Sequence, residues 1–599
     1  MPPIALLFAL AARLPYFVGS DFPLNDGGLF AVMAQDLFAN HFALPAFTSY
    51  NSDSIPFAYP PGAFYAVAAL HALMGFDVIA VERWLPLFAD LASVVAVTAL
   101  ARATLRGAWA VALAPIIFAL LPRSYEWMIM GGGVTRALGY VLALACIVQA
   151  VHVARSPSTW RTVVCALLAA LALITHLEEG LFALYSLALV LACYGRNLRS
   201  LAVCAAVGAG AAVLSAPWWV SVMLQHGFAP FQSASMTSGW STPGTVLAAL
   251  GEFVVPPSLP LGLVGGLGLF GGTVCLLRGE VFLPLWLPMI FLLTPRSAPS
   301  QGVVPLALLA SVALADLIVP PLATMARGTH AWAPLGRLVA RGSREWVRTP
   351  GARLVVASLG LLVVLAGVYR VWPRMSLDRY SLTSLGPGER QAMAWLASNT
   401  PTDERFLVLF STWSWEEDQS GEWFPVLANR QSVLTPQGAE WLPDRLHARK
   451  VCLFQKVRDA AVGQNGLGDL DAWASDRGVV FSAIYVSKAA RGPIDWSSVV
   501  ASASTSPNYT VLLDTPDAVV VQRNLPVAPR WTGSGQFVIA EDCRSLGDED
   551  PQVQADFTGR FGDRAALAWV AEHEQELPAR PSMSRLLVQS VNSLVRPRS

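Results

Sequence analysis

Long apolar runs alternate with short polar segments from the N-terminus to about residue 372, and this pattern predicts a bundle of membrane-spanning helices. A helix needs roughly 20 mostly apolar residues to cross the hydrocarbon core of a bilayer. We therefore predict about 11 spans, near residues 3–19, 84–101, 108–122, 134–153, 162–176, 180–195, 200–220, 259–277, 281–294, 303–324 and 354–372.

A further apolar run, Phe64 to Gly75, is short and follows two prolines, so we interpret it as a helix at the outer surface. With that choice, the loop arginines fall on one side of the membrane: Arg102, Arg106, Arg155, Arg161, Arg196, Arg199, Arg278 and the arginines of residues 327–353. The positive-inside rule makes this side cytoplasmic.

The outer side then receives the loops 20–83, 123–133, 226–258 and 295–302, together with the C-terminal part of the chain. We predict a transmembrane domain over 1–375 and an extracytoplasmic domain over 376–599. The expected location is a plasma (inner) membrane, as a multi-pass protein.

The region after residue 376 has the mixed pattern of a soluble α/β domain. It predicts helices at 388–399 and 469–478, strands at 405–410 and 479–486, and a hairpin formed by 509–513 and 518–522. The polar tail from about 530 stays unassigned, although Arg560 to Glu574 has helical spacing.

Composition agrees with a membrane protein. Hydrophobic residues make up 54% of the chain and charged residues 14%, whereas a soluble protein carries about 25% charge. The net charge of +0 gives no reason to expect a nucleic-acid partner. Of the seven cysteines, Cys452 and Cys543 lie in the polar C-terminal part and could pair if that part is extracytoplasmic.

The first outer loop carries the leading candidate for chemistry, Asp26, within Asn25-Asp26-Gly27-Gly28. A carboxylate just outside a hydrocarbon slab is costly unless it faces water, a metal or a substrate. Asp26 could act as a general base or hold a divalent metal. It could also simply cap the helix predicted from Leu29 to Phe38.

The second outer loop offers Glu126 and Arg136, on either side of three consecutive glycines. Glu126 could complete a carboxylate pair with Asp26, and both acids are then candidate ligands for Mg²⁺ or Mn²⁺. Arg136 could bind a phosphate group. The alternative is a flexible connector with interfacial aromatic anchors.

Ionisable residues at two further turns are candidate substrate-binding groups. His176 and Glu178 belong to the polar break at residues 176–180, where a helix–helix turn alone would explain some polarity. Arg296 is the only basic residue of its outer loop and could contact a lipid phosphate, or snorkel to the interface.

Aromatic residues beside acids suggest sugar binding, because rings stack on a pyranose face while carboxylates accept from hydroxyls. The clearest case is Trp413, Trp415 and Glu416, and a domain core with an acidic rim is the alternative. Tyr59 opens a Tyr-Pro-Pro-Gly that favours an extended approach to a helix.

Taken together, these residues resemble the GT-C superfamily of membrane glycosyltransferases, which includes oligosaccharyltransferases, protein O-mannosyltransferases and aminoarabinose transferases. Asp26 matches the acid that this superfamily places in the first outer loop, and Tyr59-Pro-Pro-Gly matches its proline-introduced helix. Glu126 matches a further acid of the second outer loop. The chain has no Trp-Trp-Asp-Tyr-Gly motif, which argues against a sequon-directed oligosaccharyltransferase.

The resemblance implies an inverting glycosyltransferase that moves a sugar from a polyprenyl-phosphate donor to a hydroxyl of a glycan, lipid or protein, with Asp26 as general base. Arg136 and Arg296 become phosphate partners by analogy. A lipid or polysaccharide transporter (flippase) and a non-catalytic glycolipid-binding membrane subunit are the alternatives from other classes.

Overall fold

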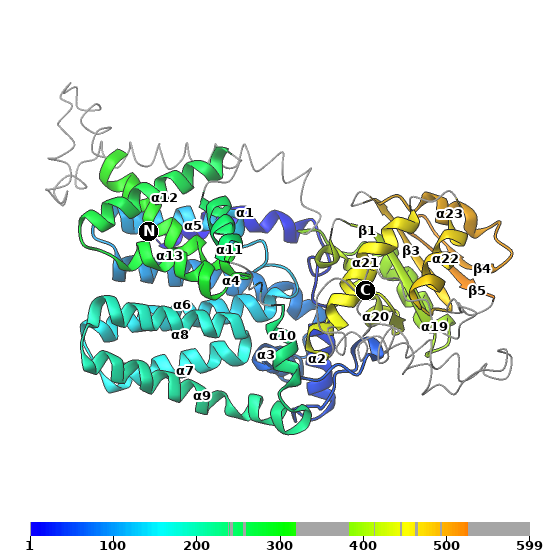
Figure 1. Ribbon diagram of the computed structural model, residues 1–599, viewed down its shortest axis with the longest axis horizontal. Helices are drawn as coiled ribbons and strands as arrows, with labels where there is room; N and C mark the ends of the chain where they lie inside the picture. The colour runs from blue at the N-terminus through cyan, green and yellow to red at the C-terminus, as the bar shows by residue number, and fades with distance from the viewer. Residues whose placement is uncertain are drawn as a thin grey trace, which may run out of the picture. The chain divides into compact units, whose positions relative to one another are not determined.

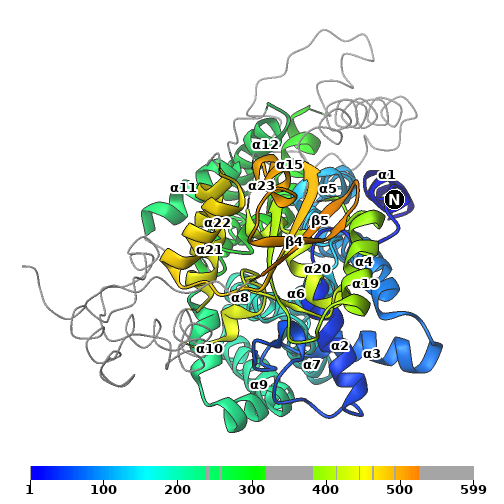
Figure 2. The same ribbon diagram turned by 90° about the vertical axis from the view of Figure 1, so that its right-hand side faces the viewer.

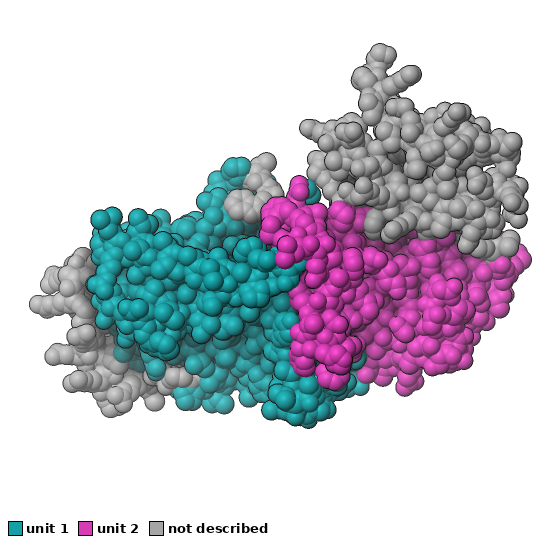
Figure 3. Space-filling view, turned by 90° about the horizontal axis from the view of Figure 1, so that it is seen from below, with its two compact units in different colours: residues 1–24, 60–221, 236–382 teal, residues 25–59, 222–235, 383–599 magenta. Residues whose placement is uncertain are grey.

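The computed structural model describes residues 2–237, 239, 243–254, 259–318, 382–412, 414–443, 446–461, 465–490 and 494–524. These residues form two compact units, shown in different colours in Figure 3. Unit 1 comprises residues 1–24, 60–221 and 236–382, and unit 2 comprises residues 25–59, 222–235 and 383–599. Residues 25–59 of the first outer loop therefore belong to the same unit as the C-terminal part of the chain.

Unit 1 is helical. Its helices are α1 (Pro2–Val18), α3 (Gly62–Met74), α4 (Val78–Thr104), α5 (Ala108–Leu120), η2 (Pro122–Ser124), α6 (Gly133–Arg155), α7 (Thr159–Thr175), α8 (Leu177–Val190), η3 (Leu191–Gly195), most of α9 (Leu198–His226), α11 (Pro243–Val254), α12 (Leu259–Leu277), α13 (Phe282–Leu293), α14 (Ala298–Gln301), α15 (Val303–Ala313) and η4 (Leu314–Ile318). Helices α6, α7 and α8 pack side by side, and α4 packs on α6 (Figure 1).

Within the described part of the chain, five helical segments are long and apolar enough to cross a membrane: 78–104, 133–155, 177–195, 198–226 and 298–316. The predicted spans near 108–122, 162–176 and 281–294 form the shorter apolar helices α5, α7 and α13. The predicted span at 354–372 lies outside the described residues. Phe64 to Gly75 forms helix α3, while its predicted place at the outer surface stays a prediction.

Two predicted loops are more helical than expected. Helix α9 continues to His226, and helices α10 (Ala229–Ser235) and α11 follow within the predicted loop 226–258. The break at residues 176–180 shrinks to His176, because α8 begins at Leu177 and takes Glu178 and Glu179 into its first turn. Acids in a first turn complement the helix dipole, which a reading of polarity alone does not take into account.

Unit 2 contains a five-stranded sheet with strand order β2-β1-β3-β5-β4. Its strands are β1 (Arg405–Ser411), β2 (Gln431–Ser432), β3 (Ala483–Ala490), β4 (Tyr509–Asp514) and β5 (Ala518–Arg523). Strand β1 pairs in parallel with β2 and β3, and β5 pairs antiparallel with β3 and β4. In the β1–β3 register, Leu407 lies opposite Ile484.

Strand β1 is buried along nearly its whole length because helices cover both faces of the sheet. Leu407 and Leu409 point to the side of α21 (Leu446–Ala461) and α22 (Leu467–Arg477). On the other face, Phe406 packs on Phe424 of α20 (Gln419–Leu427), with ring centroids 5.0 Å apart. Helix α19 (Pro387–Asn399) packs beside α20, as Figures 1 and 2 show.

Most predicted strands of this region lie close to the observed ones, but one is displaced. The strand predicted at 479–486 begins only at Ala483. Val479 and Phe481 are buried in the sheet's core without joining the ladder, so apolarity alone placed the start too early. The tail from about 530, the helical pattern at 560–574 and Cys543 all lie outside the described residues.

The N-terminal segment of unit 2 consists of α2 (Gly28–Ala39), η1 (Tyr50–Ser52) and the turns around them. The side chain of Asn51 pairs with the backbone of Ser432 in β2: its Oδ1 accepts from Ser432 N at 2.7 Å and its Nδ2 donates to Ser432 O at 2.9 Å. Asp53 forms an ion pair with Lys450 at 2.5 Å. These bonds attach the first loop to the sheet.

Candidate active site

Asp26 lies half-buried in unit 2, between two residues whose backbones are held by the C-terminal region. On one side, Asn25 donates its backbone N–H to Thr383 O at 2.8 Å and its Nδ2 to Glu416 O at 2.8 Å. Its own carbonyl oxygen accepts from Trp423 Nε1 at 3.0 Å. The side of the loop that precedes Asp26 is therefore fixed by three hydrogen bonds.

On the other side of Asp26, Gly27 donates its backbone N–H to Glu422 Oε1 at 2.8 Å. Gly27 has φ 122°, in the region that favours glycine, and it is the N-cap of α2. The N-cap residue is therefore Gly27 and not Asp26. A Cβ on Gly28 would lie 2.7 Å from Glu422 O, so α2 and α20 approach too closely for a side chain there.

Glu422 is 4% exposed and its two carboxyl oxygens serve different partners. Oε1 accepts from Gly27, and Oε2 accepts from Gln437 Nε2 at 3.0 Å. Burial and the neighbouring Asp26 carboxylate raise the pKa of Glu422 to about 8, against the opposing effect of the backbone N–H groups of Gly27 and Leu29 and of Gln437. Asp26 and Glu422 thus form a close pair of acids.

Helix α20 is itself stabilised by an acid. Asp418 is its N-cap, and Oδ1 accepts from Gly421 N at 2.8 Å. Burial raises the pKa of Asp418 to about 7, and Glu389 adds to the shift while Gly421 and Arg458 oppose it. The backbone oxygen of Glu422 accepts from Tyr50 OH at 2.8 Å, which links η1 to the same helix.

Among the described residues of unit 2, the predicted sugar-binding residues Tyr59, Trp415 and Glu416 have separate partners. Tyr59 packs with Phe30 and Trp441, at centroid distances of 4.9 and 5.6 Å. Trp415 packs edge-on against His447 at 5.2 Å. Glu416 contributes its backbone oxygen to Asn25, as described above. Trp413 lies outside the described residues.

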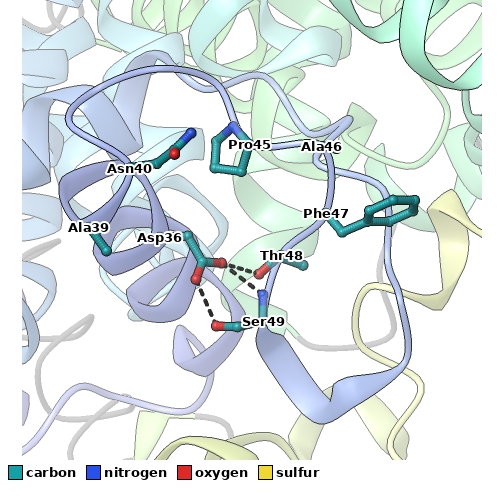
Figure 4. Close-up of a pocket in the computed structure, with 8 residues that line it drawn as sticks. All are labelled: Asp36, Ala39, Asn40, Pro45, Ala46, Phe47, Thr48 and Ser49. Atoms are coloured by element: carbon teal, nitrogen blue, oxygen red, sulfur yellow. Dashed lines mark hydrogen bonds between the residues drawn. The ribbon is translucent and has the colours of Figure 1, made fainter.

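An open hollow of about 470 Å³ lies at the end of α2, lined by Asp36, Ala39, Asn40, Pro45, Ala46, Phe47, Thr48 and Ser49 (Figure 4). Asp36 organises it: Oδ2 accepts from Thr48 Oγ1 at 2.7 Å and Ser49 N at 2.9 Å, and Oδ1 accepts from Ser49 Oγ at 2.7 Å. Its carboxylate thus shapes the loop that follows the helix.

Unit 1 contains the remaining candidates. Arg136, in the first turn of α6, donates Nη1 to Trp127 O at 2.6 Å and lies over the Trp127 ring, 5.4 Å from its centroid. The Glu178 carboxylate accepts a hydrogen bond from Ser297 Oγ. Arg296, the neighbour of Ser297, is exposed and donates Nη1 to Thr237 Oγ1 at 3.2 Å.

His176 lies in the turn between α7 and α8, in the same unit as these groups. It is 8% exposed. Burial and the positive charges of Arg136 and Arg296 lower its pKa well below the usual value. The guanidinium groups of Arg136 and Arg296 are donors suited to phosphate, so these two residues are the candidate anion-binding groups of unit 1.

Glu126, the other predicted catalytic acid, follows η2, and its backbone N–H donates to Pro122 O at 2.9 Å. It belongs to unit 1, whereas Asp26 belongs to unit 2. Within the described residues, no three His, Cys, Asp or Glu side chains are grouped as a metal site.

The sequence pattern marks Glu422 and Trp423 as members of an aromatic and acidic segment, but not as neighbours of Asp26. The segment around them stands out as acidic and aromatic in the sequence. Yet the pattern alone does not say which of its members faces the first loop. The pairing joins residues separated by 395 positions in the chain, and no local periodicity encodes such a contact.

Comparisons with known proteins place the fold. No family model matches the chain, and no curated protein matches it in sequence. Among solved structures, it is similar to the archaeal oligosaccharyltransferase AglB from Archaeoglobus fulgidus, with a TM-score of 0.51 and 14% identity over 81% of this chain and 69% of that one.

Two further structures show weaker likeness. ArnT from Cupriavidus metallidurans matches with a TM-score of 0.49 and 16% identity, over 86% of this chain and 97% of that one. The arabinofuranosyltransferase AftD from Mycobacteria matches with a TM-score of 0.48 and 16% identity, over 87% of this chain and 41% of that one. The fold of this chain is therefore similar to that of the oligosaccharyltransferase AglB.

Proposed function

We propose that this chain is an inverting membrane glycosyltransferase that moves a sugar from a polyprenyl-phosphate donor to an extracytoplasmic hydroxyl of a glycan, lipid or protein. The observation that supports it most is the likeness in fold to AglB, which was solved with a dolichol-phosphate. Asp26, whose two neighbours in the chain are both hydrogen-bonded to the C-terminal region, is the proposed base for this transfer. The proposed location is the plasma (inner) membrane, with the C-terminal part extracytoplasmic.

In the proposed reaction, the acceptor oxygen forms a bond to the anomeric carbon from the face opposite the phosphate. The bond from that carbon to the phosphate oxygen breaks, and its electron pair leaves with the polyprenyl phosphate. The acceptor proton passes to the Asp26 carboxylate. A general base of this kind contributes about 10²–10⁴-fold to a rate.

The cluster in unit 1 is proposed to bind the donor. Arg136 and Arg296 would neutralise the phosphate, whose charge increases as the bond to the sugar breaks. Glu178 orients the turn that carries Arg296 through its bond to Ser297. Of the sugar-binding candidates, Tyr59 and Trp415 present aromatic surface. Glu126 stays a proposed second catalytic acid.

A divalent metal, Mg²⁺ or Mn²⁺, would screen the donor phosphate if one binds. Its proposed ligands are Asp26 and Glu126, and within the described residues no group of three His, Cys, Asp or Glu side chains could hold a metal ion. No step of the proposed reaction is therefore assigned to a metal.

The test is transfer from radiolabelled polyprenyl-phosphate sugars by the purified protein, with and without EDTA. Wild type should transfer the sugar, and Asp26→Asn should lose about 10²–10⁴-fold in kcat. Asp21→Asn is the matched control, because Asp21 is an exposed acid of the same loop. Retained activity in Asp26→Asn would refute its role as base, and lipid movement without turnover would favour the transporter. Binding of the donor without sugar transfer or lipid movement would favour the glycolipid-binding subunit.

A further inference from the structure

Glu422 has a place in unit 2 that the proposed reaction does not yet explain. It sits in the first turn of α20, a helix that covers the sheet, yet its carboxyl group is directed to the N-terminal loop of the chain. A buried acid is costly unless its oxygens are satisfied. Both Glu422 oxygens are satisfied, one of them by the residue next to Asp26.

We propose that Glu422 is a positioning residue for Asp26, holding the Gly27 peptide so that the Asp26 carboxylate keeps one orientation in the active site. The inference rests on the proposed function of Asp26. It makes the C-terminal part of the chain a support for the catalytic loop, in addition to any role in binding an acceptor.

Three contacts of the same region support this assignment. Glu422 holds Gly27 on one side of Asp26, and Trp423 holds Asn25 O on the other. The backbone oxygen of Glu416 accepts from Asn25 Nδ2. Residues 416–423 therefore hold the residues on both sides of Asp26. Loss of these hydrogen bonds would give the backbone around Asp26 more conformational freedom.

Close packing gives independent support. Helices α2 and α20 lie so close that a Cβ at Gly28 would be only 2.7 Å from Glu422 O. Gln437, from the segment after β2, fixes the second Glu422 oxygen at 3.0 Å. The bond to Gln437 therefore fixes the orientation of the Glu422 side chain independently of Gly27. A residue that positions another must have its own conformation fixed in this way.

The experiment uses the full-length protein in detergent with three variants: Glu422→Ala, Glu422→Gln and Asp471→Asn. Gln keeps an oxygen for the Gly27 N–H, whereas Ala removes it. Asp471 is the matched control, because it is a bonded acid of the same unit that holds Arg523 at 3.0 Å and contacts no residue of the first loop in the described structure. Amide hydrogen exchange at Gly27 and the kcat and KM of transfer are measured together.

We expect Glu422→Ala to speed exchange of the Gly27 amide by about 10-fold or more. Its kcat should fall by about 10²-fold, with KM for the donor within about 3-fold of wild type, because a misplaced base affects the reaction more than binding. Glu422→Gln should stay within about 5-fold of wild type in exchange and kcat. A general loss of stability would not produce this difference between the Ala and Gln variants. Asp471→Asn should leave both unchanged.

Unchanged Gly27 exchange in Glu422→Ala would overturn the proposal, and so would faster exchange with wild-type kcat. If the wild type transfers no sugar while Glu422→Ala still exposes the Gly27 amide, the contact stands and the proposed role of Asp26 fails. Loss of kcat in Glu422→Gln equal to that in Glu422→Ala would also overturn positioning, because the retained oxygen should rescue it.

Discussion

Arg13 and Asp90 form an ion pair in which both side chains are completely buried between helices α1 and α4. The guanidinium also donates to Ala119 O at 2.8 Å and to Ser124 Oγ at 3.3 Å, so it links four segments of unit 1. A buried charge left without its partner is strongly unfavourable.

We expect Asp90→Ala to destabilise the protein by about 3–5 kcal/mol because Arg13 stays buried and uncompensated. Thermal unfolding in detergent measures the effect. Arg106→Ala is the control, since Arg106 is 81% exposed in its pair with Glu280, and it should cost less than about 1 kcal/mol. A double change of Arg13 and Asp90 to apolar residues should recover much of the loss; equal instability of the single and double variants would contradict this account.

The close approach of α2 to α20 makes Gly28 intolerant of a side chain. Gly28→Ala should destabilise the protein by about 1–3 kcal/mol because its Cβ would meet a backbone oxygen. Gly208→Ala, inside α9 where a Cβ meets nothing within 4 Å, should be neutral or stabilising by up to about 1 kcal/mol. The unfolding temperatures of the two variants are measured side by side. Equal shifts in Gly28→Ala and Gly208→Ala would contradict the close contact at Gly28.

The Asn51 side chain bonds both the backbone N–H and the backbone C=O of Ser432 in β2, as a neighbouring strand would. Asn51→Ala should cost about 1–3 kcal/mol, because Ser432 would lose partners for both its N–H and its C=O. Asn40→Ala removes a single exposed bond to Ala43 O and should change stability by less than about 0.5 kcal/mol. Faster hydrogen exchange at Ser432 only in the first variant is the expected signature.

Asp418 predicts a pH dependence of stability. Its pKa is raised to about 7, mainly by burial, so the folded protein binds its proton more tightly than the unfolded chain does. This contribution is fully present below the unfolded pKa of about 4 and is lost as the pH rises to about 7.

Asp418→Asn removes that titration and keeps an oxygen for Gly421. The stability of the wild type relative to this variant should therefore fall between about pH 4 and pH 7, by roughly 1–4 kcal/mol, and stay constant above. Unfolding temperatures recorded over this range test it, and a difference that rises with pH would show the sign to be wrong.

The arginine cluster predicts an effect on donor affinity. Arg136→Gln and Arg296→Gln should each raise KM for a polyprenyl-phosphate sugar by about 10-fold or more, since a hydrogen bond to a charged group contributes about 1.5–3 kcal/mol. Arg106→Gln should leave KM unchanged. A loss confined to kcat would instead place these residues in the reaction step.

The helical nature of unit 1 and the strands β1, β4 and β5 follow from local pattern, because span length and alternation are properties of neighbouring residues. Asp26 could be singled out for a similar reason, as an acid beside glycines next to an apolar segment. The same patterns placed the start of β3 too early, because the buried apolar residues before it resemble a strand in sequence. They also made the turn at residues 176–180 too long, because the acids in the first turn of α8 resemble a polar loop.

Only the tertiary structure decided what surrounds Asp26. Gly27 and Glu422 are 395 residues apart, and their pairing depends on how α2 packs on α20 rather than on either local sequence. Arg136, His176 and Arg296 likewise come from three separate segments of unit 1, and their positions depend on how the helices of that unit pack. Local sequence determines which elements form; long-range burial and hydrogen bonding determine which side chains meet.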